Sequence, residues 1–164
     1  MRRSALLLGF LLLVAASVTA QTPMAGVTLC APAKPDYLIR AGDNPGHSYG
    51  LAQAACTWTK PWEIAGLKST IGVGTQISET NGDTSKVRGT FVDTLTNGDR
   101  AYYTFEFSLQ TGAGGPRVMD HKWQLTGGSG KLSGVKGQGT CTAAAVGTDG
   151  SFNYDCRGEY SLPR

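Results

Sequence analysis

The sequence has few charges and no long apolar run after its first twenty residues. Charged residues are 16% of the 164, and the net charge of +3 is too small and scattered for a nucleic-acid-binding surface. Hydrophobic residues at 40% exclude a disordered polyelectrolyte. No later segment reaches the roughly 18 apolar residues that a membrane-spanning helix needs. A chain of this length and composition predicts one compact domain.

Several catalytic and cofactor-binding motifs are missing as well. No G-x-S-x-G motif marks a nucleophile. The glycine-rich stretch around Lys131 lacks both the Walker spacing and a following helix. No C-x-x-C pair occurs, and the two histidines, His47 and His121, are far in sequence from any cysteine. We therefore expect no metal site and no cofactor, and interpret His47 as a solvated loop residue.

The first twenty residues have the layout of an export signal. Arg2 and Arg3 form a short basic start, an almost unbroken apolar run covers residues 5–16, and small residues lead up to Ala20. This order of regions is typical of signal peptides. We expect cleavage after Ala20, which would place residues 21–164 in the periplasm or outside the cell. Loss of the two arginines lowers the net charge from +3 to +1.

All four cysteines lie beyond this signal. An even number of cysteines behind an export signal predicts two disulfides. A four-residue loop at residues 147–150 would set Cys141 directly opposite Cys156 across a hairpin, close enough to bond. Cys30 and Cys56 are then left to pair, which would tie the N-terminal segment to the first strand.

Residues 21–50 are predicted to form an irregular N-terminal arm, and residues 51–164 the folded domain. The arm holds four prolines and several glycines, which disfavour a long helix or a central strand. From residue 52 onward, apolar and polar residues alternate with period two, as in strands with one buried face. No helical stripe interrupts this pattern. The predicted strands are 51–60, 67–79, 84–95, 100–110, 117–126, 135–144 and 151–161, with a short one near 62–66.

Two copies of Thr-Asn-Gly-Asp, at residues 80–83 and 96–99, predict hairpin turns. At the second turn a two-residue loop would pair Phe91 with Thr104, which sets an apolar beside a polar residue. A three-residue loop with Gly98 in a left-handed bulge keeps the apolar residues of both strands on one face. Since a one-residue slip turns every side chain over, we expect the three-residue loop.

A row of about eight strands predicts an all-β fold, namely a closed antiparallel meander barrel. An open sheet of this size would leave its edges exposed, and closure removes them. An eight-stranded barrel is just wide enough for side chains to fill it or for one small ligand to occupy it. A flattened sandwich is the alternative.

The segment Thr126–Thr140 is the densest in glycine, and glycine permits positive φ in a compact turn between strands. Its pattern G-G-[ST]-G-x-[FL]-x-G-x-x-G, after a strand containing Trp123, resembles the dirigent-like and allene-oxide-cyclase-like barrels of calycin type. That resemblance implies a closed barrel with a ligand cavity, in an exported bacterial relative of unknown role. Plant cyclases of this fold cyclise a fatty-acid epoxide, and dirigent proteins steer radical coupling. None of their site residues matches a position here.

Polar residues on the predicted inward face are the candidates for catalysis. With Thr96 opposite Arg100, the register sets Asp93 opposite Tyr103, and His121 lies on the next strand but one. An Asp–His–Tyr cluster in an apolar pocket can act as a general acid or base. The alternative is that strand ends face water and His121 is a satisfied core residue.

Three functions are consistent with these features. The first is a non-catalytic barrel that binds a small apolar ligand. The second is a cofactor-free cyclase or isomerase that uses His121 with Asp93 or Tyr103. The third is an interaction protein, such as a secreted protease inhibitor whose arm enters the partner's cleft. The aromatic residues expected to contact a ligand are Trp58, Phe91, Tyr103, Phe105, Phe107 and Trp123.

Overall fold

The computed structural model describes residues 20–34, 36–147 and 149–163. The predicted export signal, apart from Ala20, lies outside the described residues. Among those that are described, no helix is long and apolar enough to cross a membrane.

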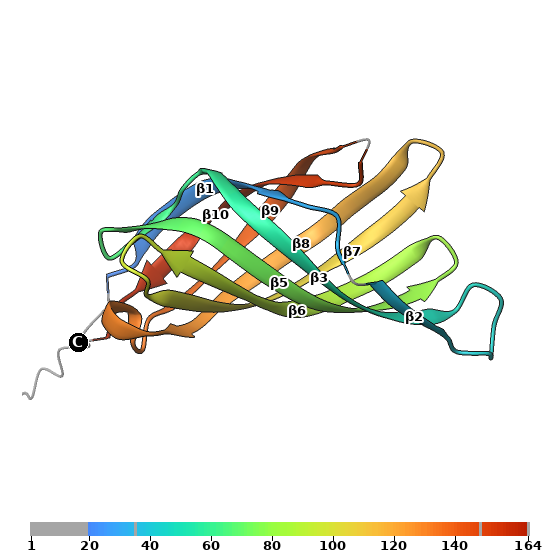
Figure 1. The fold of residues 1–164 in the computed structure, drawn as a ribbon, viewed down its shortest axis with the longest axis horizontal. Coiled ribbons are helices and arrows are strands. Elements are labelled where there is room, and N and C mark those ends of the chain that lie inside the picture. The colour runs from blue at the N-terminus through green and yellow to red at the C-terminus, as the bar shows by residue number, and fades with distance from the viewer. Residues whose placement is uncertain (1–19, 35, 148, 164) are drawn as a thin grey trace, which may run out of the picture.

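The described chain forms ten β-strands and one short 3-10 turn (Figure 1). Long alternating segments form the strands, and glycine-containing turns connect most of them. The elements are β1 (Thr22–Cys30), β2 (Asp36–Arg40), β3 (Ser48–Lys60), β4 (Glu63–Ile64), β5 (Leu67–Asn81), β6 (Thr84–Leu95), β7 (Arg100–Gly112), β8 (Gly115–Gly128), η1 (Gly130–Leu132), β9 (Lys136–Val146) and β10 (Phe152–Ser161).

Eight of the strands close into an antiparallel barrel, which confirms the predicted fold class. The order around the barrel is β1-β10-β9-β8-β7-β6-β5-β3, and β3 pairs with β1 to complete the ring. Two short strands lie outside the ring, because β4 pairs with β5 and β2 pairs with β3. Figure 1 shows the strands crossing the barrel at a steep tilt.

The prediction of an irregular arm at residues 21–50 is wrong, because β1 is a full strand of the barrel and β2 extends β3. The prolines fall where a strand tolerates them. Pro23 lies near the start of β1, in a part that pairs only with β10. Pro32 and Pro45 lie between strands.

The inner and outer faces of β5 are the reverse of what alternation predicted, which was that its apolar residues would face inward. Its apolar residues Ile71, Val73 and Ile77 point outward and are 56%, 38% and 48% exposed. Its glycines point inward, and a Cβ on Gly72 would lie 2.0 Å from the ring of Phe91 on β6. The inward face of β5 is therefore kept small to admit an aromatic ring from its neighbour.

The β6–β7 hairpin has the predicted three-residue loop, but shifted along the chain. Leu95 N–H donates to the Asp99 carbonyl, and Gly98 has a φ of 86°. Odd residues therefore pair with odd residues, as expected. The pairing sets Asp93 opposite Ala101, not Tyr103, so that part of the prediction is wrong.

Both predicted disulfides are present, Cys30–Cys56 and Cys141–Cys156. Each joins residues that face one another on adjacent strands. The alignment of the second pair depends on a β-bulge that the sequence did not predict. The β9–β10 hairpin pairs Val146 with Phe152, and a bulge next to Asn153 then restores Cys141 opposite Cys156.

The glycine-rich segment closes one end of the barrel, in keeping with its predicted structural role. Leu132 and Val135 are fully buried there. The left-handed Gly130 has no room for a side chain, because a Cβ would lie 2.1 Å from the carboxylate of Asp99. Asp99 in turn accepts a hydrogen bond from the backbone N–H of Lys131. The β6–β7 turn and the glycine-rich turn thus lock together.

Candidate functional site

The barrel encloses a cavity of about 170 Å³. Its lining is mostly apolar, and it includes both disulfides. Every aromatic residue predicted to contact a ligand lies on its wall, namely Trp58, Phe91, Tyr103, Phe105, Phe107 and Trp123.

The cavity lies nearer the end of the barrel opposite the glycine-rich turn. Exposed Ala31 and Gly150 belong to its lining, so it reaches the surface between the end of β1 and the β9–β10 turn. Trp58 and Trp62 lie at its inner part, with ring centroids 4.3 Å apart. The cavity is therefore a pocket that opens at one end and has the two tryptophans as the floor at its inner end.

A β-bulge lies in β8 beside His121, which faces this cavity. Glu106 pairs with Lys122 but Ser108 pairs with Met119, so two residues of β8 face Phe107 alone. Asp120 within the bulge has a φ of 54°, a left-handed conformation that is uncommon for a residue other than glycine. His121 faces inward in alternation with Trp123 and Leu125, and the bulge turns Met119 outward, against the expected alternation. Bulges often redirect a side chain next to a functional site.

Aromatic rings surround His121 on three sides. Its ring centroid lies 5.1 Å from Phe107, 5.9 Å from Phe105 and 5.2 Å from Tyr154. Its Nδ1 is buried and has no hydrogen-bond partner among the described residues. Burial lowers the pKa of His121 to about 4, so the imidazole is neutral at pH 7 and one of its nitrogens can accept a proton.

Two further polar atoms of the cavity wall lack partners. The Tyr103 hydroxyl and the Trp123 Nε1 are buried and unbonded within the part of the chain that is described. Burial, and secondarily the charge of Asp93, raises the pKa of Tyr103 well above its usual value, so the phenol stays protonated. Both groups are therefore hydrogen-bond donors. A buried donor without a partner costs about 1–3 kcal/mol, and a ligand acceptor would remove that cost.

Asp93 belongs to a separate cluster beneath the cavity. It is fully buried and accepts hydrogen bonds from Trp58 Nε1 (2.9 Å), Trp62 Nε1 (3.0 Å) and the Ser69 hydroxyl. Burial raises its pKa to about 6, although the three hydrogen bonds act in the opposite direction. By accepting these hydrogen bonds, the Asp93 carboxylate orients the two tryptophans of the cavity floor.

The structure brings only part of the predicted Asp–His–Tyr cluster together. His121 and Tyr103 line the same cavity, but no hydrogen bond joins them. Asp93 is not part of the lining, and its carboxylate is already bonded. Sequence reasoning missed Phe152 and Tyr154, which also line the cavity. Trp62 stacks on Tyr103, and Tyr154 packs edge-on against His121.

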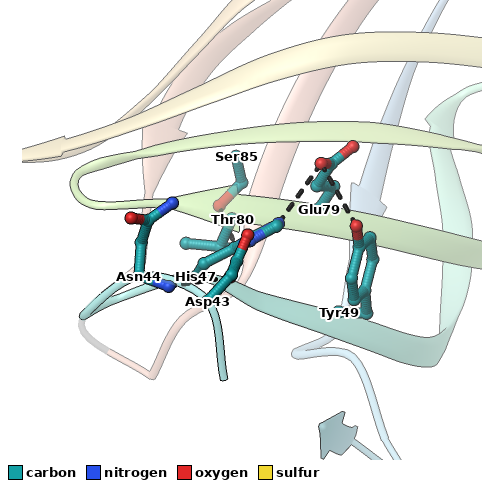
Figure 2. Close-up of polar contacts among 7 residues, drawn as sticks. All are labelled: Asp43, Asn44, His47, Tyr49, Glu79, Thr80 and Ser85. Carbon is teal, nitrogen blue, oxygen red and sulfur yellow. Dashed lines mark hydrogen bonds and ion pairs between the residues drawn. The ribbon is translucent and has the colours of Figure 1, made fainter. Parts of the chain in front are cut away.

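A second polar cluster lies on the outer surface, at the β2–β3 turn (Figure 2). His47 Nδ1 is 2.6 Å from Asp43 Oδ1, and its Nε2 is 3.3 Å from Glu79 Oε1 on β5. The Tyr49 hydroxyl donates to the same Glu79 oxygen at 3.4 Å. The side chain of His47 is only 11% exposed, so the prediction of a solvated loop histidine is wrong.

This cluster acts as a clamp that holds the β2–β3 turn to β5. The hydrogen bond to Asp43, and then the one to Glu79, raises the pKa of His47. The two carboxylates bind opposite nitrogens of the His47 ring. They therefore do not share one position at which a metal ion could bind all three side chains. No group of three or more potential metal ligands occurs among the residues searched, which are those described.

Comparison with known proteins adds information about the fold only. No family model matches the chain, and no curated protein matches it. Among solved structures it is similar to a pterocarpan synthase dirigent protein, with 12% sequence identity and a TM-score of 0.52. The match covers 99% of this chain and 98% of that one. At this identity the likeness establishes a dirigent-like barrel fold.

Proposed function

We propose that the protein is exported and binds a small, flat, largely apolar ligand that carries a hydrogen-bond acceptor. The observation that supports this most directly is the cavity, with its aromatic walls and two unbonded donors on Tyr103 and Trp123. Two disulfides agree with an oxidising compartment. The barrel fold shared with a dirigent protein also favours a cavity function.

The size of the cavity restricts the ligand to one or two rings. An engineered apolar cavity of about 150 Å³ holds a benzene molecule. The value of about 170 Å³ here is similar, and its open end allows part of a larger molecule to project. A hydroxyl, carbonyl or ether oxygen on the ligand would accept hydrogen bonds from the two donors.

The test uses two neighbouring alanines of β3. Ala54 lines the cavity, whereas Ala55 is exposed on the outer face. We expect the parent protein and Ala55→Phe to bind 2-naphthol, with a change in tryptophan fluorescence because Trp58, Trp62 and Trp123 surround the site. Ala54→Phe should weaken that binding at least tenfold, because its ring fills the cavity.

Naphthalene is the matched probe without an oxygen atom. If Tyr103 and Trp123 bind an acceptor, the parent should bind 2-naphthol more tightly than naphthalene. Equal binding of the two would contradict the acceptor. Binding of 2-naphthol that is unchanged in Ala54→Phe, or no binding by the parent at all, would contradict the site.

A second candidate function is cofactor-free proton-transfer catalysis, such as an isomerisation or cyclisation. The neutral, unbonded His121 at the cavity, next to the left-handed Asp120 of the β8 bulge, supports it. In that case His121→Gln abolishes turnover but keeps 2-naphthol binding within a few-fold. Turnover that survives this substitution would remove the evidence for His121.

The third hypothesis, an inhibitor that inserts a free arm, has lost its supporting feature. Residues 22–30 form a barrel strand that is hydrogen-bonded on both sides over part of its length. The interior is also open rather than filled.

A further inference from the structure

The strand β2 has one sheet edge that is open along its whole length. It pairs only with β3 and ends the sheet order, whereas each barrel strand pairs with a neighbour on both sides over at least part of its length. In Figure 1, β2 and the turn that follows it project beyond one end of the barrel. The His47 clamp fixes this turn against Glu79 (Figure 2).

The middle of β2 is apolar and highly exposed. Tyr37, Leu38 and Ile39 are 62%, 64% and 70% exposed, and they are the most exposed large hydrophobic residues of the described chain. Natural sheets protect their edges with proline, bulges or inward-pointing charges, and an exposed apolar edge pairs readily with another strand. None of these protections interrupts residues 37–39.

The hydrogen-bond pattern shows which backbone groups face the open edge. Ala41 N–H donates to the His47 carbonyl, 3.0 Å away, so this is a hydrogen-bonded pair of the β2–β3 ladder. In an antiparallel ladder every second residue turns its N–H and C=O toward the same neighbour. Residues 37 and 39 therefore face β3, and residues 36, 38 and 40 present their backbone groups to the open edge.

We propose that β2 is a self-association site, at which two copies of this chain pair edge to edge and antiparallel about a two-fold axis at Leu38. This register sets residue 36 opposite residue 40 of the second copy, and Leu38 opposite its own counterpart. The outward-facing backbone groups of residues 36, 38 and 40 then meet one another. A two-fold axis makes the contact self-complementary and closed, so no filament forms.

The residue types along β2 match this register. The sequence has an acidic residue at position 36 and a basic one at Arg40, so each end of the paired strands combines opposite charges. Tyr37 lies opposite Ile39 of the second copy, which pairs an aromatic with a β-branched residue. The strand is complementary to an antiparallel copy of itself, and this self-complementarity favours a second copy of the chain as the partner over an unrelated peptide.

The surface beside β2 extends the contact. Tyr37 and Ile39 share the outer face with Leu51 and Tyr49, their partners on β3, which are 48% and 44% exposed. The pairing thus covers a continuous apolar area on β2 and β3. Because a five-residue edge buries less than a standard interface, we expect a weak dimer with a dissociation constant in the micromolar range.

The first test is sedimentation equilibrium of the mature chain, with charge variants of β2. Arg40→Asp places two acidic residues opposite one another at both ends of the contact and should weaken the dimer at least tenfold. The exchange Asp36→Arg with Arg40→Asp restores opposite charges and should restore the dimer. Arg117→Asp, which makes the same change on exposed β8, is the control and should leave the association unchanged.

Leu38→Pro is the second test, because it removes an N–H that faces the open edge without removing a bond to β3. It should give a monomer with the thermal stability of the parent. The proposal is overturned if the parent is monomeric at high micromolar concentration, if it forms another oligomer that these variants do not affect, or if the charge exchange fails to restore the dimer. Since 2-naphthol binding in the cavity is measured separately, failure here leaves the proposed function standing.

Discussion

His121 and Asp93 show how burial shifts the pKa values of two side chains in opposite directions. Burial lowers the pKa of His121 to about 4 and raises the pKa of Asp93 to about 6. In both residues the neutral form is favoured, because an apolar interior disfavours charge. The Nδ1 of His121 has no hydrogen-bond partner among the described residues, whereas Asp93 accepts hydrogen bonds from two tryptophans, so their roles differ.

These two shifts predict opposite effects of acid on stability. Between pH 6.5 and about 4 the unfolded histidine takes up a proton that folded His121 refuses, so its contribution to the free energy of unfolding falls as pH falls. Between about pH 6 and 3.8 folded Asp93 takes up a proton before the unfolded residue does, so its contribution rises as pH falls. In the parent protein the two partly cancel.

As the pH falls from 6.5 to 4, we therefore expect the free energy of unfolding to decrease less in His121→Gln than in the parent. The difference should reach up to about 3 kcal/mol. Asp93→Asn should lose more than the parent over the same range. Urea unfolding at several pH values measures the slope of the unfolding free energy against pH. A pH-independent loss of stability caused by the substitution itself does not change this slope. Parallel curves for the parent and both variants would contradict the assigned environments.

At the scale of the strand, β5 shows why alternation alone does not tell the inner face from the outer. Both faces of β5 alternate cleanly, glycine on one and apolar residues on the other. The ring of Phe91 needs the space over Gly72, and this requirement comes from β6. The glycines therefore face inward and the larger residues face outward.

Two glycines of β5 provide a matched test of this packing. A Cβ on Gly72 would overlap Phe91, whereas a Cβ on Gly74 would lie 3.5 Å from the same ring, at ordinary contact distance. We expect Gly72→Ala to lower the free energy of unfolding by about 1–3 kcal/mol through overpacking. Gly74→Ala should be close to neutral. Urea denaturation of both variants measures the difference, and equal losses would show that Phe91 yields without cost.

At the scale of the whole molecule, the closure of the barrel depends on its two short ladders, β1–β3 and β8–β9, which have four residue pairs each. β1 and β3 share only four residue pairs, interrupted by a bulge, whereas β9 and β10 share ten. Cys30–Cys56 lies in the short ladder and Cys141–Cys156 in the long one. Both disulfides line the cavity, but only the first holds a short ladder where the barrel closes.

Removal of each disulfide should reveal this difference. The loops closed, 26 and 15 residues, correspond to similar entropic terms of about 3.5 and 3 kcal/mol. We expect the double substitution of Cys30 and Cys56 by serine to lower the melting temperature more and to weaken 2-naphthol binding. The same change at Cys141 and Cys156 should lower the melting temperature but preserve binding. Thermal denaturation and fluorescence titration measure both, and loss of binding in both variants would contradict a special role for the first disulfide.

The candidate site was predictable in part. Strand periodicity placed five aromatic residues of the cavity wall, those on β6, β7 and β8, on one face, because their alternation is local. The bulge at Asp120 could not be foreseen, since its residue types are ordinary for a strand and the extra residue is apparent only against β7. The same reason hid the register that separates Asp93 from Tyr103.

The sequence by itself determined the approximate positions of the strands from β3 to β10 and the disulfide pairing, because alternation and turn chemistry act between near neighbours in the chain. It did not predict β1 and β2, because the prolines of residues 21–50 argue against strands, whereas Pro23 lies near the start of β1 and Pro32 and Pro45 lie between strands. Only the tertiary structure decided which face of β5 is inside, where β8 bulges, and which edge stays open at β2. These features depend on contacts between strands that are distant in sequence, and closure of the barrel is what brings those strands together.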